Sequence, residues 1–136
     1  VIFNANQTVE GKRKAIYHTN VMMCIAETFA VVCLSSIDDK KERKNVVEHL
    51  KQDGKEIIDI TEAQLNNFAG NMLQVKAANN ERYLIMSEAA YNSLTKAQIS
   101  TLEKHTKILS SSLHTIETCG GGSARCMMAE IFLPKG

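Results

Sequence analysis

The sequence predicts a mixed α/β fold built of repeated units, each consisting of two strands, a helix and a third strand. Short apolar stretches alternate with charged stretches of helical composition. The same order returns roughly 50 residues further along the chain, a period typical of solenoid and propeller proteins. The chain has 136 residues, of which 44% are hydrophobic. This length and composition indicate one globular domain, or part of one.

The first unit spans about residues 20–60 and opens with a hairpin. Residues 20–37 contain two short apolar strands, and the polar pair Glu27–Thr28 between them suits a turn. The stretch Glu-Ile-Ile-Asp-Ile at residues 56–60 predicts the third strand of the unit.

A helix over residues 38–54 completes the first unit. Asp38 or Asp39 can cap its start with a side-chain oxygen, and Gly54 stands where a helix commonly ends. The lysines and glutamates lie opposite a short apolar stripe, so we expect the run Asp-Asp-Lys-Lys-Glu-Arg-Lys to be a solvated helix face.

The second unit spans about residues 71–113 and repeats the order of the first. Residues 71–77 and 82–88 predict two strands with a polar break between them. Residues 87–105 have a helical composition, in one piece or two. Residues 107–113 predict the closing strand, so the second unit matches the first element by element.

Two capping boxes mark helix starts in this part of the chain. Thr61 and Gln64 have the spacing at which the two side chains bond each other's backbone N–H groups, so we expect a short helical turn there. Thr95 and Gln98 repeat that spacing inside the second helical stretch. That stretch would divide at this second capping box.

A third unit is expected to begin near residue 126. The stretch Cys-Met-Met-Ala-Glu-Ile-Phe-Leu-Pro resembles the opening strands of the first two units, where Asn20 and Asn71 hold equivalent places. If the units close into a ring, His18, just before the first opening strand, and Cys126, at the start of the third, face one axis. Periodicity alone leaves both a ring and a linear array open.

The charge and hydropathy of the chain exclude several classes of partner. The formal net charge is +1, which calls for neither nucleic acid nor an anionic membrane surface. No apolar run approaches the roughly 18 residues that span a bilayer, and no secretory signal is visible. The chain begins with Val1 and not with Met, so we expect it to be cut from a longer one.

Four cysteines, Cys24, Cys33, Cys119 and Cys126, are expected to be reduced thiols in a cytoplasmic protein. Two disulfides are the alternative, but the chain has no secretory signal and is not cysteine-dense. It has no Cys-x-x-Cys pair and no zinc-finger spacing, so the sequence predicts no metal site and no cofactor.

The glycine-rich stretch at residues 120–126 indicates nucleophilic catalysis. A cysteine reacts as its thiolate, so a nucleophilic Cys126 needs a proton carrier, for which His18 is the candidate. Glycines such as Gly122 let a substrate approach the backbone closely and leave N–H groups to face it. Arg125 adds positive charge beside the sulfur. The alternative is a loop that leads into a strand whose first residue is a small buried cysteine.

Three motifs together resemble the guanidino-group-modifying superfamily of arginine deiminases, amidinotransferases, dimethylarginine hydrolases and succinylarginine dihydrolase. They are Tyr-His-Thr-Asn at residues 17–20, Phe-Ala-Gly-Asn-Met-Leu-Gln-Val at residues 68–75, and the glycine-rich stretch that leads into Cys126. The nearest resemblance is to the amidinotransferase-like branch called citrulline-utilisation hydrolases. It implies that residues 1–136 are the C-terminal part of a five-bladed α/β propeller (pentein) of ββαβ units.

The resemblance also implies a reaction and its residues. Cys126 matches the family nucleophile and His18 its general acid/base, with Asn20 and Gly122 beside the substrate. The thiolate attacks the central carbon of a small guanidino or ureido compound, and water or an amine resolves the covalent intermediate. Asn20 stands where many relatives have an aspartate, so it cannot supply the negative charge that holds a guanidinium.

Two further expectations follow from the resemblance. The other substrate-binding carboxylates of the family lie in its N-terminal units, so the isolated segment would have weak activity or none. Its open propeller faces would be covered by a second copy, as a homodimer. A non-catalytic α/β binding or assembly module on the same repeat is the alternative function.

Overall fold

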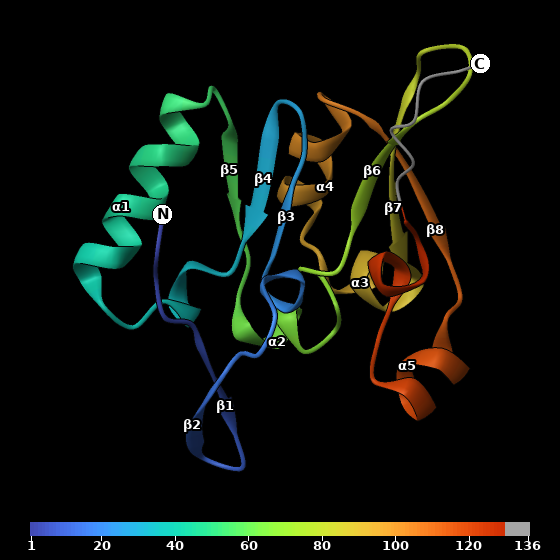
Figure 1. The fold of residues 1–136 in the computed structure, drawn as a ribbon. Coiled ribbons are helices and arrows are strands. Elements are labelled where there is room, and N and C mark those ends of the chain that lie inside the picture. The colour runs from blue at the N-terminus through green and yellow to red at the C-terminus, as the bar shows by residue number, and fades with distance from the viewer. Residues whose placement is uncertain (130–136) are drawn as a thin grey trace.

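The computed structural model describes residues 1–129 and has a mixed α/β fold with three small sheets (Figure 1). A short N-terminal hairpin forms the first sheet, and the other two sheets each contain three strands in chain order. The strands are β1 (Asn6–Val9), β2 (Lys12–Ala15), β3 (Met23–Ile25), β4 (Phe29–Val32), β5 (Glu56–Asp59), β6 (Leu73–Lys76), β7 (Arg82–Ser87) and β8 (Lys107–Ser111). The α-helices are α1 (Lys40–Gln52), α2 (Glu62–Leu65), α3 (Glu88–Ser93), α4 (Lys96–Glu103) and α5 (His114–Gly120).

The two three-stranded sheets have the same topology. In the first, β3 pairs antiparallel with β4, and β4 pairs parallel with β5. In the second, β6 pairs antiparallel with β7, and β7 pairs parallel with β8. Helical segments connect the parallel strands, α1 in the first unit and α3 with α4 in the second. The predicted order of strand, strand, helix and strand is confirmed in both units.

Helix α1 begins and ends close to the predicted residues. Asp39 caps its start, because one carboxylate oxygen accepts the N–H groups of Lys41 at 2.7 Å and Glu42 at 3.0 Å. Gly54 follows the helix at a φ of +71°, a conformation that glycine adopts without steric cost. The apolar stripe is buried and the opposite face is exposed, as predicted.

The two predicted capping boxes also join the two units. Both form, Thr61 with Gln64 and Thr95 with Gln98. The glutamine side chains then pair with each other: Gln64 Nε2 donates to Gln98 Oε1 at 2.7 Å, and Gln98 Nε2 donates to Gln64 Oε1 at 3.2 Å. Gln64 is only 7% exposed. We call these four residues, Thr61, Gln64, Thr95 and Gln98, the cap joint.

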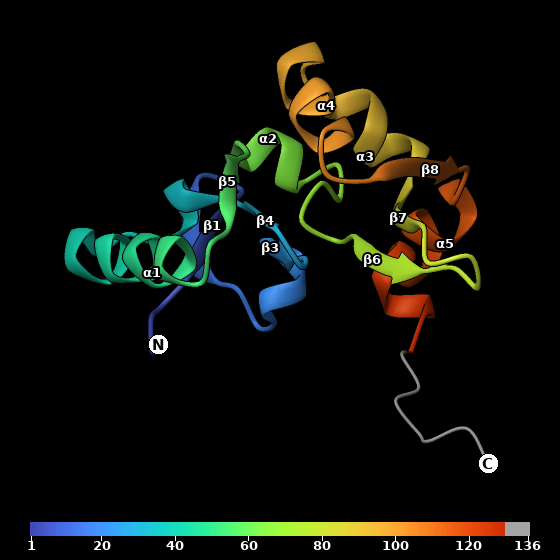
Figure 2. The same ribbon diagram turned by 90° about the horizontal axis from the view of Figure 1, so that it is seen from above.

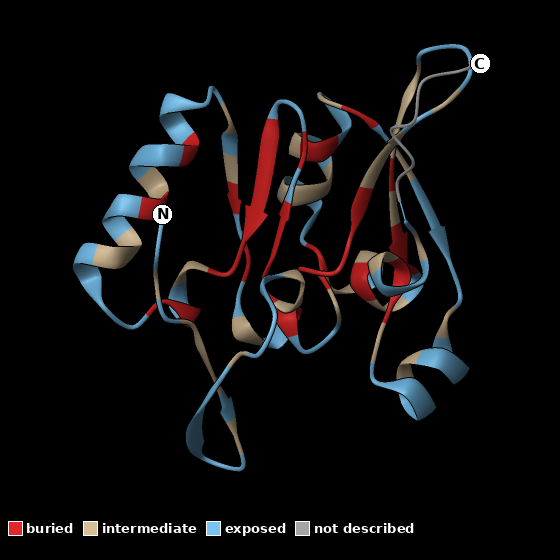
Figure 3. Cartoon of the chain, viewed as in Figure 1, coloured by how far each residue is buried: buried red, intermediate tan, exposed pale blue. Residues whose placement is uncertain are grey.

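One hydrophobic core runs through both units (Figure 3). Strand β4, the central strand of its sheet between β3 and β5, is buried along its whole length. Large, fully buried side chains come from both units, among them Phe29, Met22, Met72 and Leu84. The units therefore fold against each other.

A second contact joins the units beside the turn between β3 and β4. The ring of His105 lies between two side chains of the first unit, with Nδ1 at 2.9 Å from Thr28 Oγ1 and Nε2 at 2.8 Å from Glu56 Oε2. The same ring packs on Phe29, with the ring centroids 5.3 Å apart. His105 thus connects the second unit to the first.

Several features differ from the sequence prediction. Cys126 does not start a strand; it lies in the 3₁₀ turn Ala124–Met127, and residues 130–134 of the predicted strand lie outside the described residues. Helix α5 and the β1–β2 hairpin were not predicted, because most of their residues are exposed and give no apolar pattern.

The two units lie side by side, with β3 and β6 as neighbouring strands between them and α1 at the outer edge (Figure 2). The backbone N–H of Glu27, just after β3, donates to the side chain of Gln74 in β6 at 3.0 Å. Residues 1–129 contain these two units and no closed ring. Within the same residues, no helix has both the length and the apolar character needed to cross a bilayer.

Candidate active site

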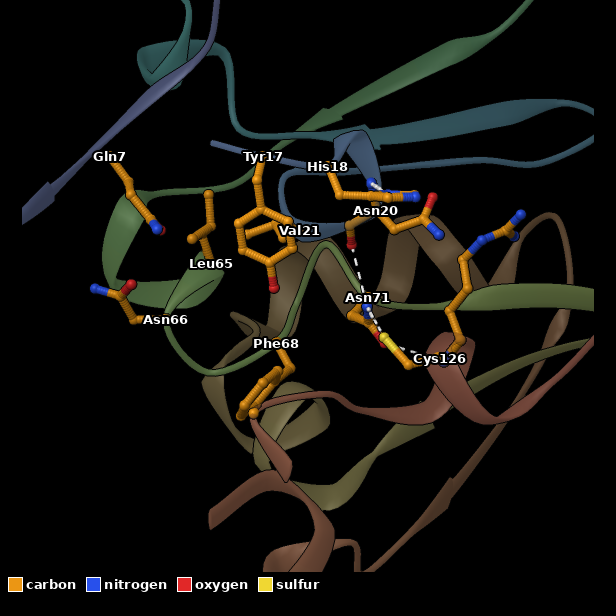
Figure 4. A pocket seen from close by; sticks show the side chains of 12 residues that line it. Gln7, Tyr17, His18, Asn20, Val21, Leu65, Asn66, Phe68, Asn71 and Cys126 are labelled. Atoms are coloured by element: carbon orange, nitrogen blue, oxygen red, sulfur yellow. Dashed lines mark hydrogen bonds between the residues drawn. The ribbon is translucent and has the colours of Figure 1, made fainter. Parts of the chain in front are cut away.

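A cavity of about 490 Å³ lies where the two units and the C-terminal turn meet (Figure 4). Its lining includes His18 and Asn20 from the loop before β3, Asn71 from the loop before β6, and Cys126 from the 3₁₀ turn. Three of the four residues that the sequence predicts for the site therefore share one cavity. Although His18 and Cys126 are 108 positions apart, both side chains are exposed to solvent.

His18 is held by the turn that it begins. It caps the 3₁₀ turn Thr19–Val21, and its Nδ1 accepts the backbone N–H of Asn20 at 3.2 Å. A ring nitrogen that accepts a hydrogen bond carries no proton, so the neutral ring has its proton on Nε2. The sequence Tyr-His-Thr-Asn thus orients the imidazole through its own backbone.

Cys126 lies in a turn that depends on a nearby glycine. A Cβ at Gly122 would stand 3.2 Å from Cys126 Cβ and 3.3 Å from its Sγ, so the absence of a side chain there lets the loop pass close to the sulfur. Gly121, at a φ of +65°, lines the cavity, whereas Gly122 is not among the described lining residues. Gly122 supports the position of the cysteine in this structure, and its contact with substrate stays a prediction.

The other cysteines lie in different surroundings. Cys24 and Cys33 are buried in the core, as predicted for residues inside apolar strands. Cys119 is exposed on α5 and does not belong to the cavity lining. Cys126 is therefore the cysteine that opens into the cavity with a histidine.

Asn71 connects its own loop, before β6, to the other two segments that meet at the cavity. Its Nδ2 donates to the backbone oxygen of Asn20 at 3.2 Å and to Cys126 Sγ at 3.2 Å, and its Oδ1 accepts the N–H of Arg125 at 3.0 Å. Asn71 was not among the site residues predicted from the sequence. The available signal was its equivalence with Asn20 in the repeat and its place in one of the three motifs.

The described lining of the cavity carries one cation and no carboxylate. Arg125 is the cation, and the remaining polar lining consists of neutral amides, Tyr17 and His18, together with Cys126. No cluster of three or more His, Cys, Asp or Glu side chains that could hold a metal ion occurs in residues 1–129. The chemistry available from these residues is that of a thiol, an imidazole and several hydrogen-bonding groups.

The N-terminal hairpin reaches the cavity through Gln7 and is anchored by Arg13. The Arg13 guanidinium contacts Asp38 at 2.6 Å and Glu62 at 2.5 Å. Its hydrogen bond to Asp38 raises the pKa of Arg13 and lowers the pKa of that carboxyl. Burial alone would raise the pKa of Glu62, but the Thr8 N–H and Arg13 together hold it below its ordinary value.

The model of the family "N,N dimethylarginine dimethylhydrolase, eukaryotic" matches residues 1–133. The chain belongs to this family. The expected membership of the guanidino-group-modifying superfamily is thereby confirmed. No curated protein sequence matches the chain.

Two solved structures of ArgZ, an arginine dihydrolase from the ornithine-ammonia cycle in cyanobacteria, have a similar fold. The apo enzyme matches with a TM-score of 0.60 and 20% identity, over 81% of this chain and 16% of that one. Its N-terminal domain, bound to product, matches with a TM-score of 0.57 and 20% identity, over 81% and 36%.

These matches show an α/β fold of the ArgZ type and correct one expectation. The matched region of ArgZ belongs to its N-terminal domain, so the chain does not correspond to the C-terminal part of that enzyme. The position of the chain within such a domain stays a prediction. The chain spans 16% of the complete ArgZ chain and 36% of its N-terminal domain.

Proposed function

We propose that the protein is a cysteine-dependent hydrolase of a small guanidino compound, with Cys126 as nucleophile and His18 as general acid/base. The observation that carries this proposal is the cavity that both side chains share. The family to which the chain belongs is named for N,N-dimethylarginine, and ArgZ is an arginine dihydrolase. We therefore take N,N-dimethylarginine and arginine as the first substrates to test.

The first half of the reaction forms a covalent thiouronium intermediate at Cys126. The thiolate attacks the guanidinium carbon, the C–S bond forms, and the electron pair of the C=N bond moves to nitrogen. The tetrahedral species then loses its amine: the C–N bond breaks, and protonated His18 supplies a proton from Nε2 to the departing nitrogen. A thiouronium cation remains on Cys126, and His18 is neutral.

The second half returns the enzyme to its starting state. His18 takes one proton from water at Nε2 as the oxygen attacks the thiouronium carbon. The C–S bond then breaks to release the thiolate and a ureido product, whose remaining hydroxyl proton passes to the released amine or to solvent. In these steps the ring holds a proton on Nδ1, which ends the bond from the Asn20 N–H. The exposed side chain has room for this change. If an amine attacked the same intermediate in place of water, the reaction would be an amidinotransfer.

Substrate binding by this chain would depend on neutral groups and one cation. Asn20 is placed to bond a planar nitrogen-rich group, Gly122 keeps the loop close to the sulfur, and Arg125 suits a carboxylate. The carboxylates that hold a guanidinium would come from further units of the fold. We propose that residues 1–136 form part of such a five-bladed propeller, in a cytoplasmic protein, and that the isolated segment is weakly active and dimerises through its open faces.

The test uses the full-length protein with N,N-dimethylarginine, arginine and citrulline in turn, with and without an amine acceptor. We expect release of an amine and a ureido product, and a covalent adduct on Cys126 visible by mass spectrometry after acid quench. Cys126→Ser should abolish turnover, His18→Ala should reduce it strongly, and Cys119→Ser, which changes an exposed thiol outside the cavity, should leave it intact. Turnover that survives in Cys126→Ser, or no turnover by the unaltered protein with any of the three compounds, would overturn the proposal.

A further inference from the structure

We propose that Asn71 is a positioning residue that aims the Cys126 sulfur and donates a hydrogen bond to it during the reaction. This proposal rests on the proposed function, because it gives the sulfur a role that only a nucleophile needs. The direct observation is the 3.2 Å contact between Asn71 Nδ2 and Cys126 Sγ, from a side chain that is only 5% exposed.

The surroundings of Asn71 determine which way its amide points. An asparagine side chain has two N–H donors and one carbonyl oxygen. Both donors are used, on the Asn20 backbone oxygen and on the Cys126 sulfur, and the oxygen accepts the Arg125 N–H. A flipped amide would put oxygen against oxygen at Asn20 and nitrogen against the N–H of Arg125. The N–H group is therefore the part that faces the sulfur.

The backbone before Asn71 is built to hold this side chain in place. Phe68 has a φ of +64°, a left-handed conformation that is sterically unfavourable for a non-glycine residue. The carbonyl of Phe68 accepts the Asn71 N–H at 2.8 Å, which closes the turn. Gly70 then lies so close to the first unit that a Cβ would stand 2.4 Å from the Val21 oxygen. This fixed turn presents Asn71 to both Asn20 and Cys126.

The hydrogen bond to sulfur acts on two stages of the reaction. A donated N–H stabilises negative charge on its acceptor, so it supports the anionic sulfur that attacks. Once the C–S bond forms, the sulfur loses its charge and the bond weakens; it strengthens again when the C–S bond breaks and the thiolate leaves. Because Asn71 also bonds the N–H of the residue before Cys126, it fixes the direction of the sulfur.

The experiment compares Asn71→Asp with Asn66→Asp in the full-length protein. Aspartate at 71 has the same shape and can still accept the Arg125 N–H, but it places a carboxylate oxygen against the sulfur. Asn66 lines the same cavity, so Asn66→Asp adds the same charge away from the Asn71 bond. The readout is the rate of Cys126 alkylation by iodoacetamide between pH 5 and pH 10, resolved by peptide mass spectrometry, with Cys119 as the internal reference.

We expect Asn71→Asp to slow alkylation of Cys126 about tenfold at pH 7, since a neighbouring negative charge disfavours an anionic sulfur. Asn66→Asp should change the rate by less than about twofold, because its charge lies farther from the sulfur. Alkylation of Cys119 should be the same in all proteins. A folded Asn71→Asp protein with the unaltered profile at Cys126 would overturn the positioning role.

A second measurement does not depend on the folding of a variant. In the unaltered protein labelled with ¹⁵N, the side-chain NH₂ signals of Asn71 should shift when Cys126 is alkylated, and should follow the same pH profile as the alkylation rate. Asn71 signals that shift neither on alkylation of Cys126 nor with pH would contradict the proposal. Because alkylation needs no substrate, this result is separate from turnover. If the protein turns over substrate but Asn71 does not affect Cys126, the proposed function stands and only the role of Asn71 is wrong.

Discussion

The two units meet in two polar places that are built differently, the cap joint and the cavity. At the cap joint, Gln64 and Gln98 bond each other and the starts of their own helices, and Gln64 is nearly inaccessible to water. At the cavity, Asn71 is buried and fully bonded, but the two groups beside it, His18 and Cys126, remain exposed. The comparison teaches that polar groups which bond only the protein stabilise the fold, whereas those left open to solvent are available for chemistry.

The largest effect is expected from Cys126→Ser, which changes the cavity alone. Activity of the full-length protein should fall by about 10³-fold or more, because the hydroxyl is a far weaker nucleophile than the thiolate. The free energy of unfolding in urea should change by less than about 0.5 kcal/mol, since the side chain is exposed. A large loss of unfolding free energy would show that Cys126 stabilises the fold, as the cap joint does.

Gly70→Ala should damage both regions, because its new Cβ meets backbone atoms and not flexible side chains. The added methyl would lie 2.4 Å from the Val21 oxygen and 2.8 Å from the Met22 carbonyl carbon, so the two units must separate. We expect a loss of about 2–3 kcal/mol in the free energy of unfolding, together with a lower activity. Gly120→Ala is the matched control, since its Cβ would meet nothing closer than 4.0 Å.

Gln64→Ala should lower stability and leave the chemistry intact. The change leaves Gln98 and the Ser93 carbonyl without their partner in a nearly buried place, which costs about 1–3 kcal/mol. Urea unfolding measures the loss, and kcat well below the unfolding transition should stay within about twofold. The control is Gln52→Ala at the exposed end of α1. If Gln64→Ala instead reduced kcat without lowering stability, the contrast between the two regions would be wrong.

The smallest effect is a pH dependence at the Arg13 anchor of the hairpin. Arg13 holds the pKa of Asp38 and Glu62 below their ordinary values, so the folded state gains stability above those ordinary values and loses it as the pH falls through the lowered ones. Arg13→Gln should reduce this acid-side loss of unfolding free energy between pH 5 and pH 3, and Lys12→Gln should not. Salt should weaken the difference, because the groups are partly exposed. If Arg13→Gln and Lys12→Gln gave identical curves of unfolding free energy against pH, Arg13 would not anchor the hairpin.

The sequence predicted the elements that local residue patterns determine. Apolar stretches and the capping residues Asp39, Thr61 and Thr95 gave the two units in the correct order, because helix caps depend on residues within three positions. The motif comparison also brought out His18 and Cys126, which the structure places in one cavity.

Features that depend on distant residues or on exposed segments were missed. The 3₁₀ turn at Cys126 is held partly by Asn71, which is 54 positions from the Arg125 N–H that it bonds, and no local pattern reports such a contact. The β1–β2 hairpin has no apolar face; its signal was the turn at Glu10 and Gly11, both with positive φ, which suits glycine but rarely glutamate. Helix α5 lacks a side-chain cap at its start, so it gave no recognisable boundary.

The bond between Asn71 and the sulfur has a consequence for how the protein is made. Synthesis proceeds from the N-terminus, and domains commonly fold as they emerge from the ribosome. The histidine and the amide donor are in place once the second unit has begun to form, but the thiol arrives some 55 positions after the amide. Under the proposed mechanism, a nascent chain therefore carries no reactive pair until the segment that holds Cys126 docks, which keeps the thiolate away from cellular electrophiles before that point.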